Sequence, residues 1–94
     1  MAFMWISTYV SAAEVAHGLP DFQKRYAVTG ASQQTDVPSS TDNRRVEIMA
    51  DVAIQYQIGT SPSVTADSNP LPANVIIYKD LPRGHRIAYR TPLP

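Results

Sequence analysis

The chain has 94 residues, a length that allows one small domain. Its composition, 44% hydrophobic and 17% charged, is typical of a globular protein rather than a disordered one. Eight Lys and Arg balance eight Asp and Glu, which argues against a nucleic-acid-binding protein, because binding phosphates takes an excess of basic side chains. The sequence has no cysteine, which excludes disulfides, thiolate metal sites and cysteine nucleophiles.

The size and charge of the chain together predict self-association. A domain this small buries only about 60–70% of the surface that its unfolded chain exposes. No disulfide or obvious metal site adds stability, and zero net charge removes the repulsion that keeps small proteins apart. We therefore expect a homo-oligomer.

The first ten residues, MAFMWISTYV, are apolar. They are about half as long as a membrane-spanning helix of ~20 residues and lack the basic start of a secretory signal, so we expect neither. Two alternatives remain: a first β-strand, or an extended N-terminal arm that packs Phe3, Trp5 and Tyr9 on another subunit. An arm predicts that a chain without residues 1–9 folds but does not assemble, whereas a strand predicts that it unfolds.

The overall residue usage favours strands over helices. Valine and isoleucine total fifteen against four leucines, and eight prolines interrupt the chain too often for long helices. The exception is 11–17, SAAEVAH, where a short helix is predicted. Ser11 and Glu14 have the spacing of a capping box, and Gly18 and Pro20 follow as stop signals.

Strands and polar loops alternate after residue 20. A strand or extended lead-in is predicted over 22–28, and the polar residues 29–43 predict a long loop that lies against a partner. Within 44–58 the even-numbered residues from Val46 to Ile58 are apolar. Fifteen residues exceed the usual length of a strand, so we expect a bulge or tight turn at Ala50–Asp51 that divides them into two strands.

The remaining elements complete an all-β fold. Residues 59–74 predict a second, proline-rich loop, 75–78 (VIIY) a short buried strand, 79–85 a turn with Gly84 in the left-handed conformation, and 86–90 the last strand. We expect a small β-sandwich or jelly-roll-like barrel with long loops. Residues 1–25 are assigned to the arm or first strand with a short helix, and 26–94 to the β-sandwich domain.

The titratable residues do not predict an enzyme. His17 and His85 stand far apart in turn-like contexts, and neither has a second metal ligand nearby in the sequence. The carboxylates are scattered, and only Glu47 and Asp51 are spaced to form a pair, with ionic contacts the simpler role for Glu47. We predict no catalytic residue, no cofactor and no metal site.

The candidate functional residues are instead contact residues. Three groups are predicted to touch another subunit: the N-terminal aromatics, polar and apolar residues of the first long loop, and arginines near the C-terminus as a polar rim. They are Phe3, Trp5, Tyr9, Gln33, Gln34, Val37, Arg83, Arg86 and Arg90.

Three segments of the second half resemble a recurring pattern in small all-β virion proteins of tailed bacteriophages. The first is 58–66, IGTSPSVTA, which resembles a strand entering an "iG-x-x-P-x-x-T-A" turn. The second is 71–74, LPAN, before the strand VIIY, and the third is 83–88, RGHRIA, which resembles an "x-x-G-x-x-i-A" hairpin. The polar lead-in 29–38, TGASQQTDVP, is loosely similar to theirs.

The resemblance implies a non-enzymatic part of the phage particle, assembled in the host cytoplasm. Its expected partner is the major capsid protein or another virion subunit, and its expected role is a capsid decoration or cement subunit. A head–tail or tail accessory protein, or the base of a head fibre, is the alternative within this class. Outside it, a carbohydrate- or receptor-binding β-sandwich module is the alternative, with Tyr56 between Gln55 and Gln57 as its local signal.

Overall fold

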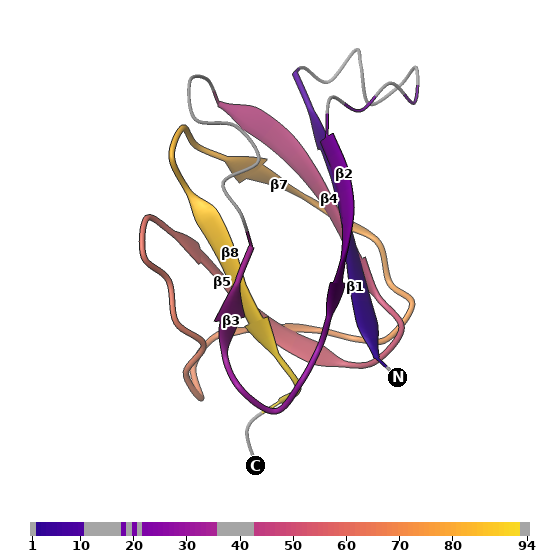
Figure 1. The fold of residues 1–94 in the computed structure, drawn as a ribbon, viewed down its shortest axis with the longest axis vertical. Helices are drawn as coiled ribbons and strands as arrows, with labels where there is room; N and C mark the ends of the chain where they lie inside the picture. The colour runs from indigo at the N-terminus through magenta and orange to yellow at the C-terminus, as the bar shows by residue number, and fades with distance from the viewer. Residues whose placement is uncertain (1, 11–17, 19, 21, 36–42, 93–94) are drawn as a thin grey trace.

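The computed structural model describes residues 2–10, 18, 20, 22–35 and 43–92, and it confirms an all-β fold. Eight strands form two antiparallel sheets of four that lie face to face (Figure 1). Sheet A has the order β2 (Phe22–Ala27), β1 (Phe3–Tyr9), β4 (Arg44–Ala50), β7 (Ile77–Leu81). Sheet B has the order β3 (Gln33–Gln34), β8 (Arg86–Arg90), β5 (Ile54–Gly59), β6 (Asn69–Leu71).

The hydrophobic core lies between the two sheets. It is built from the residues of each strand whose side chains point to the inner face. Successive side chains of a strand point to opposite faces, so one residue in two reaches the core. Tyr26 of sheet A meets Tyr89 of sheet B with ring centroids 5.7 Å apart. The other members of the cluster are Met4, Ile6, Val28, Val46, Ile48, Ala50, Ile54, Tyr56, Leu71, Leu81 and Ile87.

The break predicted at Ala50–Asp51 is confirmed, and it is the point where the chain passes from sheet A to sheet B. β4 ends at Ala50 and β5 begins at Ile54. The Phe3 amide donates to Asp51 Oδ1 over 2.9 Å, and the Asp51 amide donates to the Phe3 carbonyl over 3.1 Å. The passage keeps the even-numbered residues of both strands on the core side, which is why their apolar phase continues across the break.

The N-terminal segment is the first strand rather than an arm. β1 pairs with β2 on one side and with β4 on the other, and Met4 and Ile6 are fully buried. The arm alternative is therefore wrong for residues 3–9, because their backbone groups are used in both ladders of one sheet. The boundary expected after residue 25 falls inside β2, which belongs to the same sheet.

Both predicted loops contain a short edge strand. β3 lies within 29–43 and pairs with β8, and β6 lies within 59–74 and pairs with β5. Such short strands carry little periodicity, so the polar and proline-rich composition concealed them. The helix predicted over 11–17 lies outside the described residues, and the structure describes no helix elsewhere.

The strand predicted as buried over 75–78 is displaced and largely exposed. β7 covers Ile77–Leu81, and Val75 and Ile76 precede it with exposed fractions of 41% and 51%. The prediction was wrong because β7 is an edge strand that pairs with β4 on one side only, and because Val75 and Ile76 lie before the paired residues. The turn that follows is shorter than expected, and Gly84 adopts the predicted left-handed conformation with φ of 76°.

Each described sheet edge carries a feature that discourages strand pairing. Lys24 of β2 pairs with Ile6, and Lys79 of β7 pairs with Val46, so both lysines stand on the core side of an edge strand. A charge directed inward at an edge would be buried by a strand added there, which disfavours such addition. In sheet B, β3 has two residues, and β6 contains Pro70.

Deletion of residues 1–9 should unfold the protein rather than only prevent assembly. It removes the strand that joins β2 to β4, and burial of Met4 and Ile6 is worth about 2–5 kcal/mol each, against a total stability of about 5–15 kcal/mol. The far-UV circular dichroism signal of β-structure should be lost. A truncated chain with an intact β signal and cooperative thermal unfolding would contradict the central position of β1.

Lys79→Val should increase self-association by removing the inward charge at the β7 edge. Light scattering over a concentration series should give a larger mass for this variant than for the wild type at the same concentration. Lys79→Arg keeps the charge and is the matched control. Equal masses for Lys79→Val and Lys79→Arg would mean that the charge does not protect this edge.

Candidate interaction surface

The outer face of sheet A is the side turned away from the core. The register places Trp5 of β1 beside Arg25 of β2 and Met49 of β4, and it places Glu47 beside Tyr78 of β7. We call this surface the A face; its described strand residues are Phe3, Trp5, Ser7, Tyr9, Gln23, Arg25, Ala27, Arg45, Glu47, Met49, Tyr78 and Asp80.

Large exposed hydrophobic side chains gather at sheet A. Trp5 is 37% exposed in β1, and Tyr78 is 43% exposed in β7. Val10 directly follows β1, and Val75 and Ile76 directly precede β7. In the described part of the chain, all five exposed large hydrophobics therefore lie in or beside strands of this sheet. Apolar exposure that is concentrated in this way is typical of an interaction surface.

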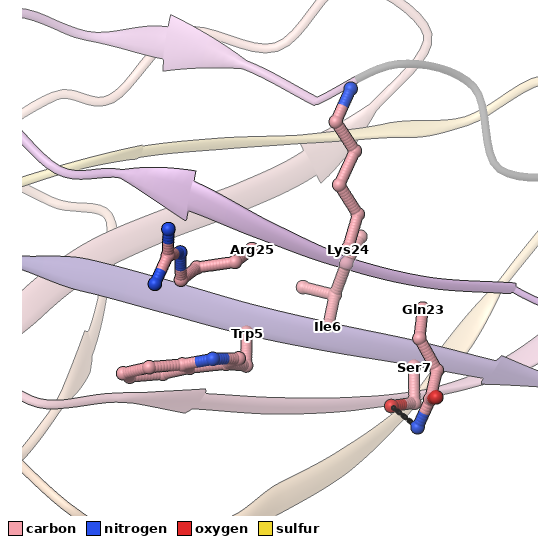
Figure 2. Close-up of a pocket in the computed structure, with 6 residues that line it drawn as sticks. All are labelled: Trp5, Ile6, Ser7, Gln23, Lys24 and Arg25. Atoms are coloured by element: carbon pink, nitrogen blue, oxygen red, sulfur yellow. Dashed lines mark hydrogen bonds between the residues drawn. The ribbon is translucent and has the colours of Figure 1, made fainter.

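A shallow hollow of about 300 Å³ opens beside Trp5. Figure 2 shows the side chains of Trp5, Ser7, Gln23 and Arg25 on one side of the sheet, with Lys24 directed to the other. The Gln23 amide donates to the Ser7 hydroxyl oxygen over 3.3 Å. The hollow thus combines an aromatic wall with polar groups on neighbouring strands.

Aromatic rings hold Arg25 at the rim of this hollow. Its guanidinium carbon lies 4.1 Å from the centroid of the Phe3 ring, a cation–π contact. The Phe3 ring in turn lies 6.1 Å from the Trp5 ring, tilted by 54°. β1 places Phe3 and Trp5 two residues apart on one face, and β2 places Arg25 directly opposite Trp5.

The carboxylates around the A face already accept bonds within the chain. Arg45 forms an ion pair of 2.9 Å with Asp80, and the Tyr78 hydroxyl donates to Glu47 Oε2 over 2.7 Å. This hydrogen bond raises the pKa of Tyr78, with smaller contributions from burial and from the Glu47 charge. Burial raises the pKa of Tyr9, and the same Glu47 charge adds to the effect.

The structure divides the predicted contact residues between different parts of the molecule. Phe3, Trp5 and Tyr9 share the A face, although Tyr9 is buried. Arg86 and Arg90 are out of phase with the core residues Ile87 and Tyr89 and therefore lie on the outer side of sheet B. The predicted N-terminal aromatics and C-terminal arginines consequently do not form one surface.

The other predicted residues lie at the margins of sheet B. Gln33 and Gln34 form β3 and are exposed, and the Gln34 amide donates to the Pro62 carbonyl over 2.7 Å. Arg83 is exposed in the turn between β7 and β8, and its backbone amide donates a hydrogen bond of 2.9 Å to Asn43 Oδ1. Val37 lies outside the described residues.

Sequence reasoning missed the partners of Trp5 on the neighbouring strands. Gln23 and Arg25 alternate with Lys24 in a strand that was predicted correctly, so the pattern indicates that they share a face. It does not indicate which strand lies beside them, because the pairing of β1 with β2 is set by the fold. Tyr56, the signal for a carbohydrate-binding module, is buried in the core.

Comparisons with known proteins gave no match. No protein-family model, curated protein or solved structure is significantly similar to the chain. Within the described ranges, no three His, Asp or Glu residues are grouped so that they could hold a metal ion. The same ranges contain no helix that is long and apolar enough to cross a membrane.

The raised pKa of Tyr78 predicts a dependence on alkaline pH. Because the pKa in the folded state lies above the ordinary value of 10.0, the stabilisation by the Tyr78–Glu47 bond is present below about pH 10. It is lost as the pH rises through the folded-state pKa. Glu47→Gln should lower the titration midpoint of Tyr78, measured from phenolate ultraviolet absorbance.

The difference between each protein and its Tyr78→Phe variant isolates the signal of Tyr78 from the other tyrosines. This subtraction is needed because the charge of Glu47 also acts on Tyr9. An unchanged midpoint in Glu47→Gln would show that the bond does not control the titration.

Proposed function

We propose that the chain is a non-enzymatic subunit that works by contact and docks on its partner through the A face. The observation that carries the proposal is the concentration of exposed hydrophobic side chains at sheet A. Trp5 and Tyr78 are of residue types that contribute most to binding when an interface buries them. The features that disfavour strand addition at the described edges favour docking by side chains.

The dimensions of the A face suit a contact that is repeated many times. Four strands about 4.8 Å apart and five to seven residues long present a projected area of roughly 400 Å². A standard interface buries about 800 Å² on each partner, so a single contact of this face is weak. A symmetric shell multiplies weak contacts into firm retention, provided that the bound subunits are linked to one another.

The specific role that we propose is a capsid decoration or cement subunit of a tailed bacteriophage. It would bind the major capsid protein or another virion subunit, form homo-oligomers and stabilise the shell because it binds the assembled state. This step rests on the resemblance of 58–66, 71–74 and 83–88 to small virion proteins. Asn74 in the second segment and Gly84 in the third have positive φ, 62° and 76°, a conformation typical of turns.

The copy number in purified phage particles tests the proposed role. Quantitative mass spectrometry of particles from the source cells should find hundreds of copies for a decoration subunit. A dozen or fewer would indicate the head–tail, tail or head-fibre-base alternative. Absence from particles would overturn the virion assignment.

Trp5→Ser should reduce occupancy on particles at least tenfold, because central aromatic residues of an interface often contribute more than 2 kcal/mol. Far-UV circular dichroism should show an unchanged fold, since Trp5 is exposed on the outer side. Arg86→Ser, on the outer side of sheet B, is the comparison. Loss of occupancy in Arg86→Ser but not in Trp5→Ser would move docking to sheet B and overturn the role of the A face.

A further inference from the structure

Arg25 is the charged group of the A face that is held in place without a hydrogen-bond acceptor among the described residues. Its contact there is with the ring of Phe3, 4.1 Å from the guanidinium carbon. The ring restrains the guanidinium plane but takes none of its five N–H donors. By contrast, Glu47, Asp51 and Asp80 each accept a hydrogen bond from a group of the chain.

The surroundings of Arg25 define what can bind beside it. Trp5 stands directly opposite on β1 and is 37% exposed, so its indole can cover an apolar group. Gln23 donates to the Ser7 hydroxyl oxygen on the far side of the hollow, which leaves the side-chain carbonyl oxygen of Gln23 as an acceptor for a ligand. The site therefore offers a fixed cation, an aromatic wall and a polar end within one hollow (Figure 2).

We propose that this hollow binds an acidic segment of the partner protein, with an Asp or Glu carboxylate on Arg25 and a neighbouring aliphatic or proline side chain on Trp5. Planar guanidinium groups bind carboxylates through two parallel hydrogen bonds, which a lysine cannot reproduce. The inference rests on the proposed docking through the A face and adds the chemistry of the partner.

Charge complementarity favours a different protein over a second copy of this chain. In a two-fold contact the A face would meet another A face, and each surface would offer the same groups. The described carboxylates of that face, Glu47 and Asp80, are already bonded within their own chain. In a contact between two copies, Arg25 would therefore have to share a carboxylate that already accepts a bond from its own chain.

The single tryptophan of the chain provides a direct probe of the hollow. The indole N–H signal of Trp5 can be followed by NMR while the full chain is titrated with the peptide acetyl-Leu-Glu-Pro-Leu-amide. Acetyl-Leu-Gln-Pro-Leu-amide is the matched neutral control. We expect the acidic peptide to bind about tenfold more tightly, as charge-assisted hydrogen bonds are about twice as strong as neutral ones, and this preference should shrink as salt is added.

Substitutions at Arg25 test which group recognises the charge. Arg25→Gln should abolish the preference for the acidic peptide, and Arg25→Lys should restore only part of it. Both variants should keep the wild-type circular dichroism spectrum, because the Arg25 side chain is exposed. Arg86→Gln, on the outer side of sheet B, changes the net charge equally and should leave the preference unchanged.

Three results would overturn the inference. Equal binding of the two peptides would show that no carboxylate is recognised, and a stronger response to glucuronate would assign the hollow to an acidic sugar. Concentration-dependent shifts of the Trp5 signal without any peptide would assign the face to a second copy. Each of these failures is separate from the proposed function, which is tested by the effect of Trp5→Ser on particles.

Discussion

The pairing of β1 with both β2 and β4 is the constraint on which the rest of the structure depends. It places Met4 and Ile6 in the core and, by alternation, Phe3 and Trp5 on the opposite side of the same strand. A shift of the register by one residue would exchange these two sets, exposing the core residues and burying the A face. The strand that stabilises the sandwich is therefore the same strand that builds the candidate interaction surface.

The edge strands and the outer face of sheet A differ in the residues that they expose. Lys24 and Lys79 bring charges to the core side of the two edge strands, where an added strand would have to bury them. The A face instead carries the exposed aromatic side chains of Trp5 and Tyr78. A small sandwich that must avoid uncontrolled pairing can in this way still offer one surface for specific docking.

Strands with a strong alternation of apolar residues could be predicted from the sequence. Strands that are defined only by pairing with a neighbouring strand could not. The division of 44–58 into two strands follows from seven even-numbered apolar residues and a length limit, and it is confirmed. β3 and β6 are two and three residues long, so only pairing with β8 and β5 defines them. VIIY looked buried because composition does not show that its strand lies at an edge.

The same reason limits prediction of the candidate site. Alternation along an extended chain is enough to put Phe3, Trp5 and Tyr9 on one face, but it does not indicate that Arg25 lies across from Trp5, because this depends on the register of β1 and β2. Arg86 and Arg90 were predicted as polar rim contacts, whereas the fold puts them on the outer side of sheet B, away from the N-terminal aromatics. Surfaces assembled from several strands need the order of those strands, which no single segment contains.

The chemistry of the A face follows from which of its polar groups are already bonded. Across the β4–β7 pair the Tyr78 hydroxyl donates to Glu47 and Arg45 forms an ion pair with Asp80, so both carboxylates of this half of the face already have a donor from the chain. On the β1–β2 half, Phe3 holds the guanidinium of Arg25 without accepting its protons. The partner that we propose would therefore need an apolar patch with a carboxylate at one side, and this asymmetry would fix the orientation of the contact.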